Sequence, residues 1–72
     1  MTEERKIELI EDLLEVDAGT ISPEMQLEDV ENWDSMTALA LIVMIDEECG
    51  RRITGNDVKA MRSVRDIMNI MG

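Results

Sequence analysis

Apolar residues return every three or four positions in the first part of the chain, and this spacing matches one face of an α-helix. The apolar positions are Ile7, Ile10, Leu13 and Leu14. The residues between them are largely charged and are expected to form a solvated face: Glu3, Glu4, Arg5, Lys6, Glu8, Glu11 and Asp12. We therefore predict a first helix over residues 3–16, before Ala18-Gly19-Thr20 breaks the period.

Residues 17–33 are predicted to form a long connection. Ser22-Pro23-Glu24 offers a capping serine, a proline at a first helical position and an acid in the first turn, so we expect at most one short helical turn. Loops of this length are usually functional or packed by their own side chains. The apolar anchors that we expect to hold the loop around the fold are Ile21, Leu27, Val30 and Trp33.

A second helix is predicted to begin at Asp34 or Ser35, to run to about Cys49 and to stop at Gly50. Leu41, Ile45 and Cys49 make one core stripe, and we expect Cys49 to be packing rather than a metal ligand or redox nucleophile. Further apolar residues cover much of the remaining circumference: Met36, Leu39, Ala40 and Val43. Either the other helices surround this helix, or part of it faces a partner.

The last third of the chain contains two further helix starts. Thr54-Gly55-Asn56-Asp57 predicts one short helix, and Ser63-Val64-Arg65-Asp66 is close to a capping box that opens the last helix. The apolar face of that last helix is Val64, Ile67, Met68 and Met71. The predicted fold is all-α: a single domain over residues 1–72, forming a small four-helix bundle with three main helices, a short third helix and a long first loop.

The charge and composition exclude several classes of function. Seventeen acidic and seven basic residues give a net charge of -10, which repels nucleic acid and anionic membranes and attracts basic proteins. The chain has no His or Tyr and one Cys, so it cannot assemble a Ser-His-Asp or Cys-His arrangement, and we expect no enzyme. Self-repulsion at this charge predicts a fold that added salt stabilises.

No metal site and no membrane insertion are expected. The best calcium-loop candidate begins at Asp29, but Asp34 stands where Gly is needed and Ala40 where the bidentate Glu belongs. The longest apolar run, residues 38–45, is far shorter than the roughly 18 residues that span a bilayer. Since Met1 is followed by charged residues rather than an apolar export segment, we expect a cytoplasmic protein, and we expect it to be a monomer.

Trp33-Asp34-Ser35-Met36 is the candidate functional motif. Backbone N–H groups without intrahelical partners and the positive end of the helix dipole would favour a phosphate ester on the Ser35 hydroxyl. The alternative is that Ser35 is a plain helix cap, which an Asp-Ser pair by itself favours.

Taken together, the sequence resembles the acyl carrier protein family over essentially its whole length. The resemblance rests on the acidic first helix, the long loop, Asp34-Ser35-Met36, Asp46-Glu47-Glu48 at the end of the second helix, Ile53, and Ser63-Val64. It implies that 4'-phosphopantetheine is esterified to Ser35 and that its thiol carries acyl groups as thioesters. It also implies that Asp34 helps a phosphopantetheinyl transferase to recognise the chain, with Met36 in place of the usual Leu.

The partners implied are that transferase, an acyl- or aminoacyl-loading ligase, and downstream transferases or synthases with basic docking patches. We expect recognition through Asp34, Met36, Leu39, Val43, Asp46 and Glu47. Fatty-acid carriers place acids early in the second helix, whereas this chain has Thr37, Ala38 and Ala40 there. The Gly-Gly of many peptidyl carriers is also missing, and Asp-Ser-Met looks like some aminoacyl carriers, including D-alanyl carriers. These features favour a dedicated carrier outside bulk fatty-acid synthesis. An unmodified acidic helical interaction module is the alternative.

Overall fold

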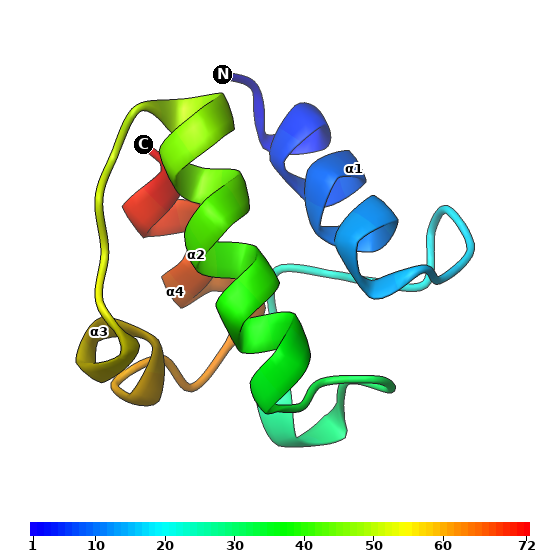
Figure 1. Cartoon of the computed structure of the whole chain (residues 1–72). Helices are drawn as coiled ribbons and strands as arrows, with labels where there is room; N and C mark the ends of the chain where they lie inside the picture. Colours follow the sequence, from blue (N-terminus) through cyan, green and yellow to red (C-terminus); the bar gives the residue numbers. More distant parts are fainter.

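The computed structural model describes residues 1–72 and contains four helices and a long first loop (Figure 1). The helices are α1 (Glu3–Leu14), α2 (Ser35–Cys49), α3 (Gly55–Lys59) and α4 (Val64–Met71), and one 3-10 turn, η1 (Leu27–Asp29), lies in the loop. The only β-type pairing is an isolated antiparallel bridge between Gln26 and Ser63. The predicted all-α fold with a short third helix is confirmed.

Helix α1 ends earlier than the predicted end at Val16. The backbone of Glu15 takes the left-handed conformation, with φ of 58°, and the Val16 N–H donates to the Glu11 carbonyl at 3.1 Å. This hydrogen bond satisfies a carbonyl at the helix end and turns the chain into the loop. Glycine normally marks such an end, so the sequence has no signal at this position.

The first loop packs as predicted, but its helical turn lies further along the chain. Pro23 and Glu24 form a simple turn rather than the start of a helix, and the 3-10 turn begins at Leu27. The loop pairs with the segment before α4, where the Leu27 N–H donates to the Arg62 carbonyl and the Val64 N–H to the Met25 carbonyl, each at 2.9 Å. The expected anchors are buried or half-buried: Ile21, Leu27, Val30 and Trp33.

The expectation that Glu11 lies on a solvated face is wrong. Its side chain is only 5% exposed, and Oε2 accepts hydrogen bonds from the N–H groups of Gly19 at 2.8 Å and Ile21 at 3.3 Å. A buried carboxylate is tolerated when backbone donors surround it. Glu11 therefore fastens the start of the loop to α1.

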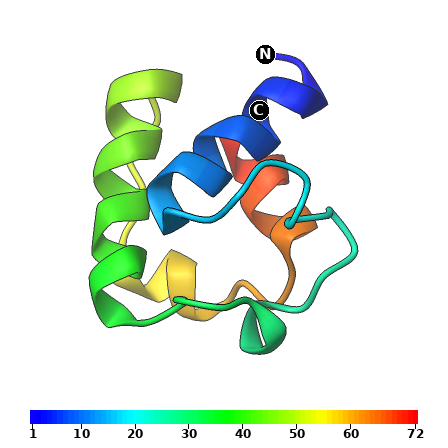
Figure 2. The same cartoon turned by 90° about the vertical axis from the view of Figure 1, so that its right-hand side faces the viewer.

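The core lies between α1, α2 and α4. Its most completely buried side chains come from all three helices: Ile10, Leu41, Ile45, Val64 and Ile67. Helix α2 packs against α1 and α3, and Figure 2 shows it at one edge of the molecule, with the other helices on one side only. The alternative in which other helices surround α2 is therefore wrong, and one face of α2 is open.

Candidate functional site

The N-terminus of α2 is closed by a capping box between Asp34 and Thr37. Asp34 Oδ1 accepts a hydrogen bond from the Thr37 N–H at 2.9 Å, and Thr37 Oγ1 accepts one from the Asp34 N–H at 2.8 Å. Asp34 is thus the N-cap residue, and Ser35 is the first residue of the helix. The alternative that Ser35 itself caps α2 is wrong.

The Ser35 side chain is exposed and makes no hydrogen bond within the protein. The backbone N–H groups of Ser35 and Met36 likewise have no protein acceptor, whereas those of Thr37 and Ala38 both donate to Asp34. An anion attached to Ser35 Oγ would meet two free donors and the positive end of a 15-residue helix. The residues present therefore fit a phosphate ester on Ser35.

Ser35 also lines a groove of about 480 Å³ between α2 and α3. Six of the ten lining residues are apolar: Trp33, Ala38, Leu39, Ile42, Val58 and Met61. The others are Asp34, Ser35, Gly55 and Lys59. An apolar groove that includes an exposed serine in its lining can shelter a flexible chain attached to that serine.

The α3 side of this groove was missed by sequence reasoning. The sequence predicts a short helix after Thr54, but it gives no indication that Val58, Lys59 and Met61 line a groove with Ser35. These residues line the groove only because of the way in which α3 packs on α2. The spacing of apolar residues in the sequence does not specify that packing. The one available signal was that apolar residues follow the capping sequence at Thr54.

The open face of α2 carries the apolar residues that were predicted to lie outside the core. Met36 is 78% exposed, Leu39 64% and Val43 55%. Helical spacing places these three side chains on one surface, which we call the α2 face, with Ala40 among them. Asp46 and Glu47 are exposed at the C-terminal end of this surface, and the first turn of α2 contains no acid. The half-buried Cys49 packs against the core as expected.

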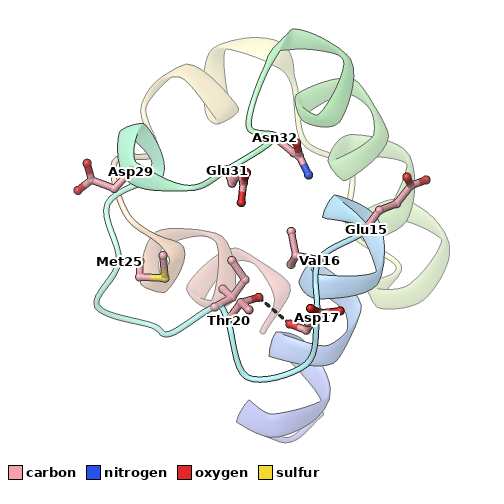
Figure 3. A pocket seen from close by; sticks show the side chains of 9 residues that line it. Glu15, Val16, Asp17, Thr20, Met25, Asp29, Glu31 and Asn32 are labelled. Carbon is pink, nitrogen blue, oxygen red and sulfur yellow. Dashed lines mark hydrogen bonds between the residues drawn. The ribbon is translucent and has the colours of Figure 1, made fainter.

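A second hollow, of about 400 Å³, lies beside the first loop (Figure 3), and Ser35 is not among the residues that line it. Four carboxylates lie around it, from Glu15, Asp17, Asp29 and Glu31, but no three acidic, Cys or His side chains come together in a group that could hold a metal ion. Figure 3 shows Glu15 and Asp29 directed away from the hollow.

Sequence comparison relates the chain to known proteins. Residues 7–70 match the family described as a phosphopantetheine attachment site. The chain belongs to this family. An acyl carrier protein from Solidesulfovibrio magneticus (strain ATCC 700980 / DSM 13731 / RS-1) is 31% identical over 68 residues, which cover 94% of this chain and 87% of that protein. No solved structure gives a significant match.

Membership of the phosphopantetheine-attachment family establishes the general role of the chain. The protein is a carrier and not an enzyme, and its cofactor is 4'-phosphopantetheine, bound covalently through a serine. Its partners include a phosphopantetheinyl transferase and biosynthetic enzymes. None of its helices combines the length and the apolar character that crossing a membrane requires.

Proposed function

We propose that Ser35 is the serine that carries the phosphopantetheine arm. The chain has three serines, at positions 22, 35 and 63. Ser63 is half-buried and its Oγ accepts the Asp66 N–H at 3.3 Å, so it is occupied as the cap of α4. Ser22 lies in the loop, where its own N–H donates to Met25 Sδ. Only Ser35 combines an exposed, unbonded hydroxyl with free backbone donors at the start of a long helix.

The function that this site supports best is that of a carrier for acyl or aminoacyl groups. The bound arm supplies a terminal thiol on which such a group is held as a thioester. The chain itself contributes the attachment hydroxyl, the donors that stabilise the phosphate, and the adjoining apolar groove. The observation that carries the proposal is the free hydroxyl of Ser35 in the lining of that groove.

Intact-mass measurement tests the attachment site. The protein is incubated with coenzyme A, magnesium and a broad-specificity phosphopantetheinyl transferase, alongside Ser35→Ala and the matched control Ser22→Ala. We expect one added phosphopantetheinyl group on the native chain and on Ser22→Ala, and none on Ser35→Ala. No addition to the native chain, under conditions that modify another carrier, would favour an unmodified acidic interaction module. Addition to Ser35→Ala would move the attachment site elsewhere.

We further propose that partner enzymes dock on the α2 face. The apolar residues Met36, Leu39 and Val43 lie close to the attachment site, whereas Asp46 and Glu47 lie at the far end of the helix. At about 1.5 Å of rise per residue, Asp46 is roughly 16 Å from Ser35 along the helix axis. A complementary enzyme would have an apolar rim at the entrance of its active site and a basic patch at about that distance.

The docking proposal is tested by placing a charge on the α2 face. Leu39→Asp should lower kcat/KM for the loading enzyme about tenfold or more, because a desolvated carboxylate would lie in an apolar contact. Asn69→Asp places the same charge on the exposed side of α4 and should change kcat/KM little. Equal losses in both variants would show that net charge, rather than this face, governs recognition.

The charge distribution on α2 also supports a dedicated pathway rather than bulk fatty-acid synthesis. The first turn of the helix offers no acid to a basic partner, while the acids of its last turns are exposed. We propose that the cargo is loaded by a ligase specific for one acyl or aminoacyl group. To check this, the protein that carries the phosphopantetheine arm is offered to fatty-acid elongation enzymes and to adenylate-forming ligases, and the rates of the two reactions are compared. Efficient elongation would contradict it.

A further inference from the structure

Lys59 is the only basic residue that lines the groove beside Ser35. It lies at the C-terminal end of α3, its side chain is exposed, and it forms no ion pair. The acidic residue of the groove, Asp34, is engaged in capping α2. A lysine in the last turn of a helix is favoured by the dipole, which accounts for its place on α3 but not for its position in a groove that Ser35 also lines.

The arm introduces a charge that this part of the molecule does not otherwise balance. A phosphodiester on Ser35 adds one negative charge to a chain whose net charge is already -10, and it places that charge next to Asp34. The free N–H groups of Ser35 and Met36 can donate to the phosphate, but they carry no full charge. Lys59 lines the same groove from α3, and its ammonium group can supply the missing full charge.

We propose that Lys59 binds the phosphodiester of the arm and holds the first part of the arm against the groove between α2 and α3. This inference rests on the proposed attachment at Ser35. Lys59 is a positioning residue, since it contacts neither the thiol nor the cargo.

The chain offers an internal control, because Lys6 on α1 is its only other lysine. Protein made with isotope-labelled lysine is examined by NMR before and after the phosphopantetheine arm is attached, and intact mass verifies the attachment. In these experiments, loaded means carrying this arm without cargo. We expect the side-chain Nζ and Cε resonances of Lys59 to shift on loading and those of Lys6 to stay in place. No substitution is needed for this measurement, so its outcome does not depend on the folding of a variant.

Substitution provides the second measurement. In loaded Lys59→Met, the phosphorus resonance should move from its native position and the amides of the arm should become more mobile in relaxation measurements. Loaded Lys6→Met should match the native protein, and Lys59→Arg should restore much of the native behaviour. Circular dichroism of the unloaded variants checks that the fold is kept.

The outcomes separate the two proposals. If the native chain gains no mass, the proposed attachment and the role of Lys59 both fail. If the chain loads at Ser35 but the Lys59 resonances stay fixed and Lys59→Met leaves the arm unchanged, attachment stands and the Lys59 proposal is overturned. A shift that is restricted to Lys59, together with loss of arm order in Lys59→Met, supports it.

Discussion

Single residues with unusual surroundings hold the first loop in place. Glu11 is buried and accepts two loop N–H groups, while Asn32 has a left-handed backbone with φ of 69°. The Asn32 side chain donates from Nδ2 to the Leu14 carbonyl at 3.1 Å, so it satisfies one of the last carbonyls of α1. The loop is thus attached to α1 at both ends, through one acceptor and one donor.

Removal of the Glu11 carboxylate should loosen the first of these attachments. Glu11→Ala leaves the N–H groups of Gly19 and Ile21 without an acceptor, and we expect a loss of about 1–3 kcal/mol in the free energy of unfolding. Urea unfolding measures the loss. Glu8→Ala on the same helix removes only an exposed pair with Arg5 and should cost less than about 1 kcal/mol. Equal losses would contradict a specific role for Glu11.

The two roles of Asn32 can be separated by a pair of substitutions. Asn32→Gly keeps the left-handed backbone and loses only the hydrogen bond to Leu14, whereas Asn32→Ala loses the bond and adds backbone strain. We expect Asn32→Ala to be less stable than Asn32→Gly by about 1 kcal/mol, which corresponds to roughly 4–8 °C in Tm for a domain of this size. The melting curves of the two variants give the comparison, and identical values would show that backbone strain at this position is unimportant.

At the scale of elements, α2 is defined by local signals at both of its ends. The capping box of Asp34 and Thr37 starts it, and Gly50, with φ of 65°, ends it through its N–H bond to the Asp46 carbonyl at 3.1 Å. Ser35 contributes no hydrogen bond to this cap. The side chains that stabilise the helix start are therefore different from the side chain proposed to carry the arm.

This separation predicts opposite behaviour for neighbouring substitutions. Thr37→Val leaves the Asp34 N–H without its acceptor and should lower the free energy of unfolding by about 1 kcal/mol. Ser35→Ala should change it by less than about 0.5 kcal/mol, because the hydroxyl has no protein partner. Chemical unfolding of both unloaded proteins checks this. A large loss in Ser35→Ala would mean that the serine supports the helix after all.

The start of α4 predicts a dependence of stability on pH. The N–H groups of Arg62 and Ser63 donate to the Asp66 carboxylate at 2.9 and 3.1 Å and lower its pKa below the usual 3.8. Because the folded pKa is lowered, Asp66 stabilises the fold above its unfolded pKa, and this stabilisation is lost as the pH falls through the folded pKa. The Tm difference between the native chain and Asp66→Asn should be constant above about pH 5 and shrink below pH 4. A pH-independent difference would contradict this.

At the scale of the whole molecule, negative charge is spread widely and weakly neutralised. The ion pairs are Arg5 with Glu8, and Arg65 with Glu3 and Glu24, and all are exposed. Exposed pairs add little stability, whereas the repulsion that remains at a net charge of -10 acts over the whole surface.

Added salt should therefore stabilise the fold. The Debye length falls from about 30 Å at 0.01 M to about 10 Å at 0.1 M salt, so repulsion among distant carboxylates is screened over this range. We expect Tm to rise by several degrees, and we expect a smaller rise in the double variant Asp29→Asn, Glu31→Gln, which has less charge to screen. Calorimetry over a salt series measures both slopes, and a Tm that ignores salt would contradict the prediction.

The sequence correctly predicted the helix ends that depend on residues close together in the chain. It did not predict the features that depend on contacts between distant segments. Thr54, Ser63 and Gly50 mark helix ends through groups a few residues away, and all three act as expected. In the sequence, Glu11 stands among charged and apolar residues like any glutamate on the surface of a helix. It is buried only because the first loop folds back against α1. The groove wall opposite Ser35 likewise exists only after α3 packs on α2. A short motif was enough to propose Ser35 as the attachment serine, whereas nothing along the chain pointed to Lys59, which is proposed to bind its phosphate.

The two-sided character of α2 has a consequence for protein engineering. Its buried side chains, such as Leu41 and Ile45, maintain the core, while Met36, Leu39 and Val43 project into solvent from the other side of the same helix. Substitutions on the outer side can therefore vary widely with little effect on folding. If partner enzymes dock on this surface as proposed, a library restricted to those three positions would sample enzyme preferences, because none of the three side chains belongs to the buried core.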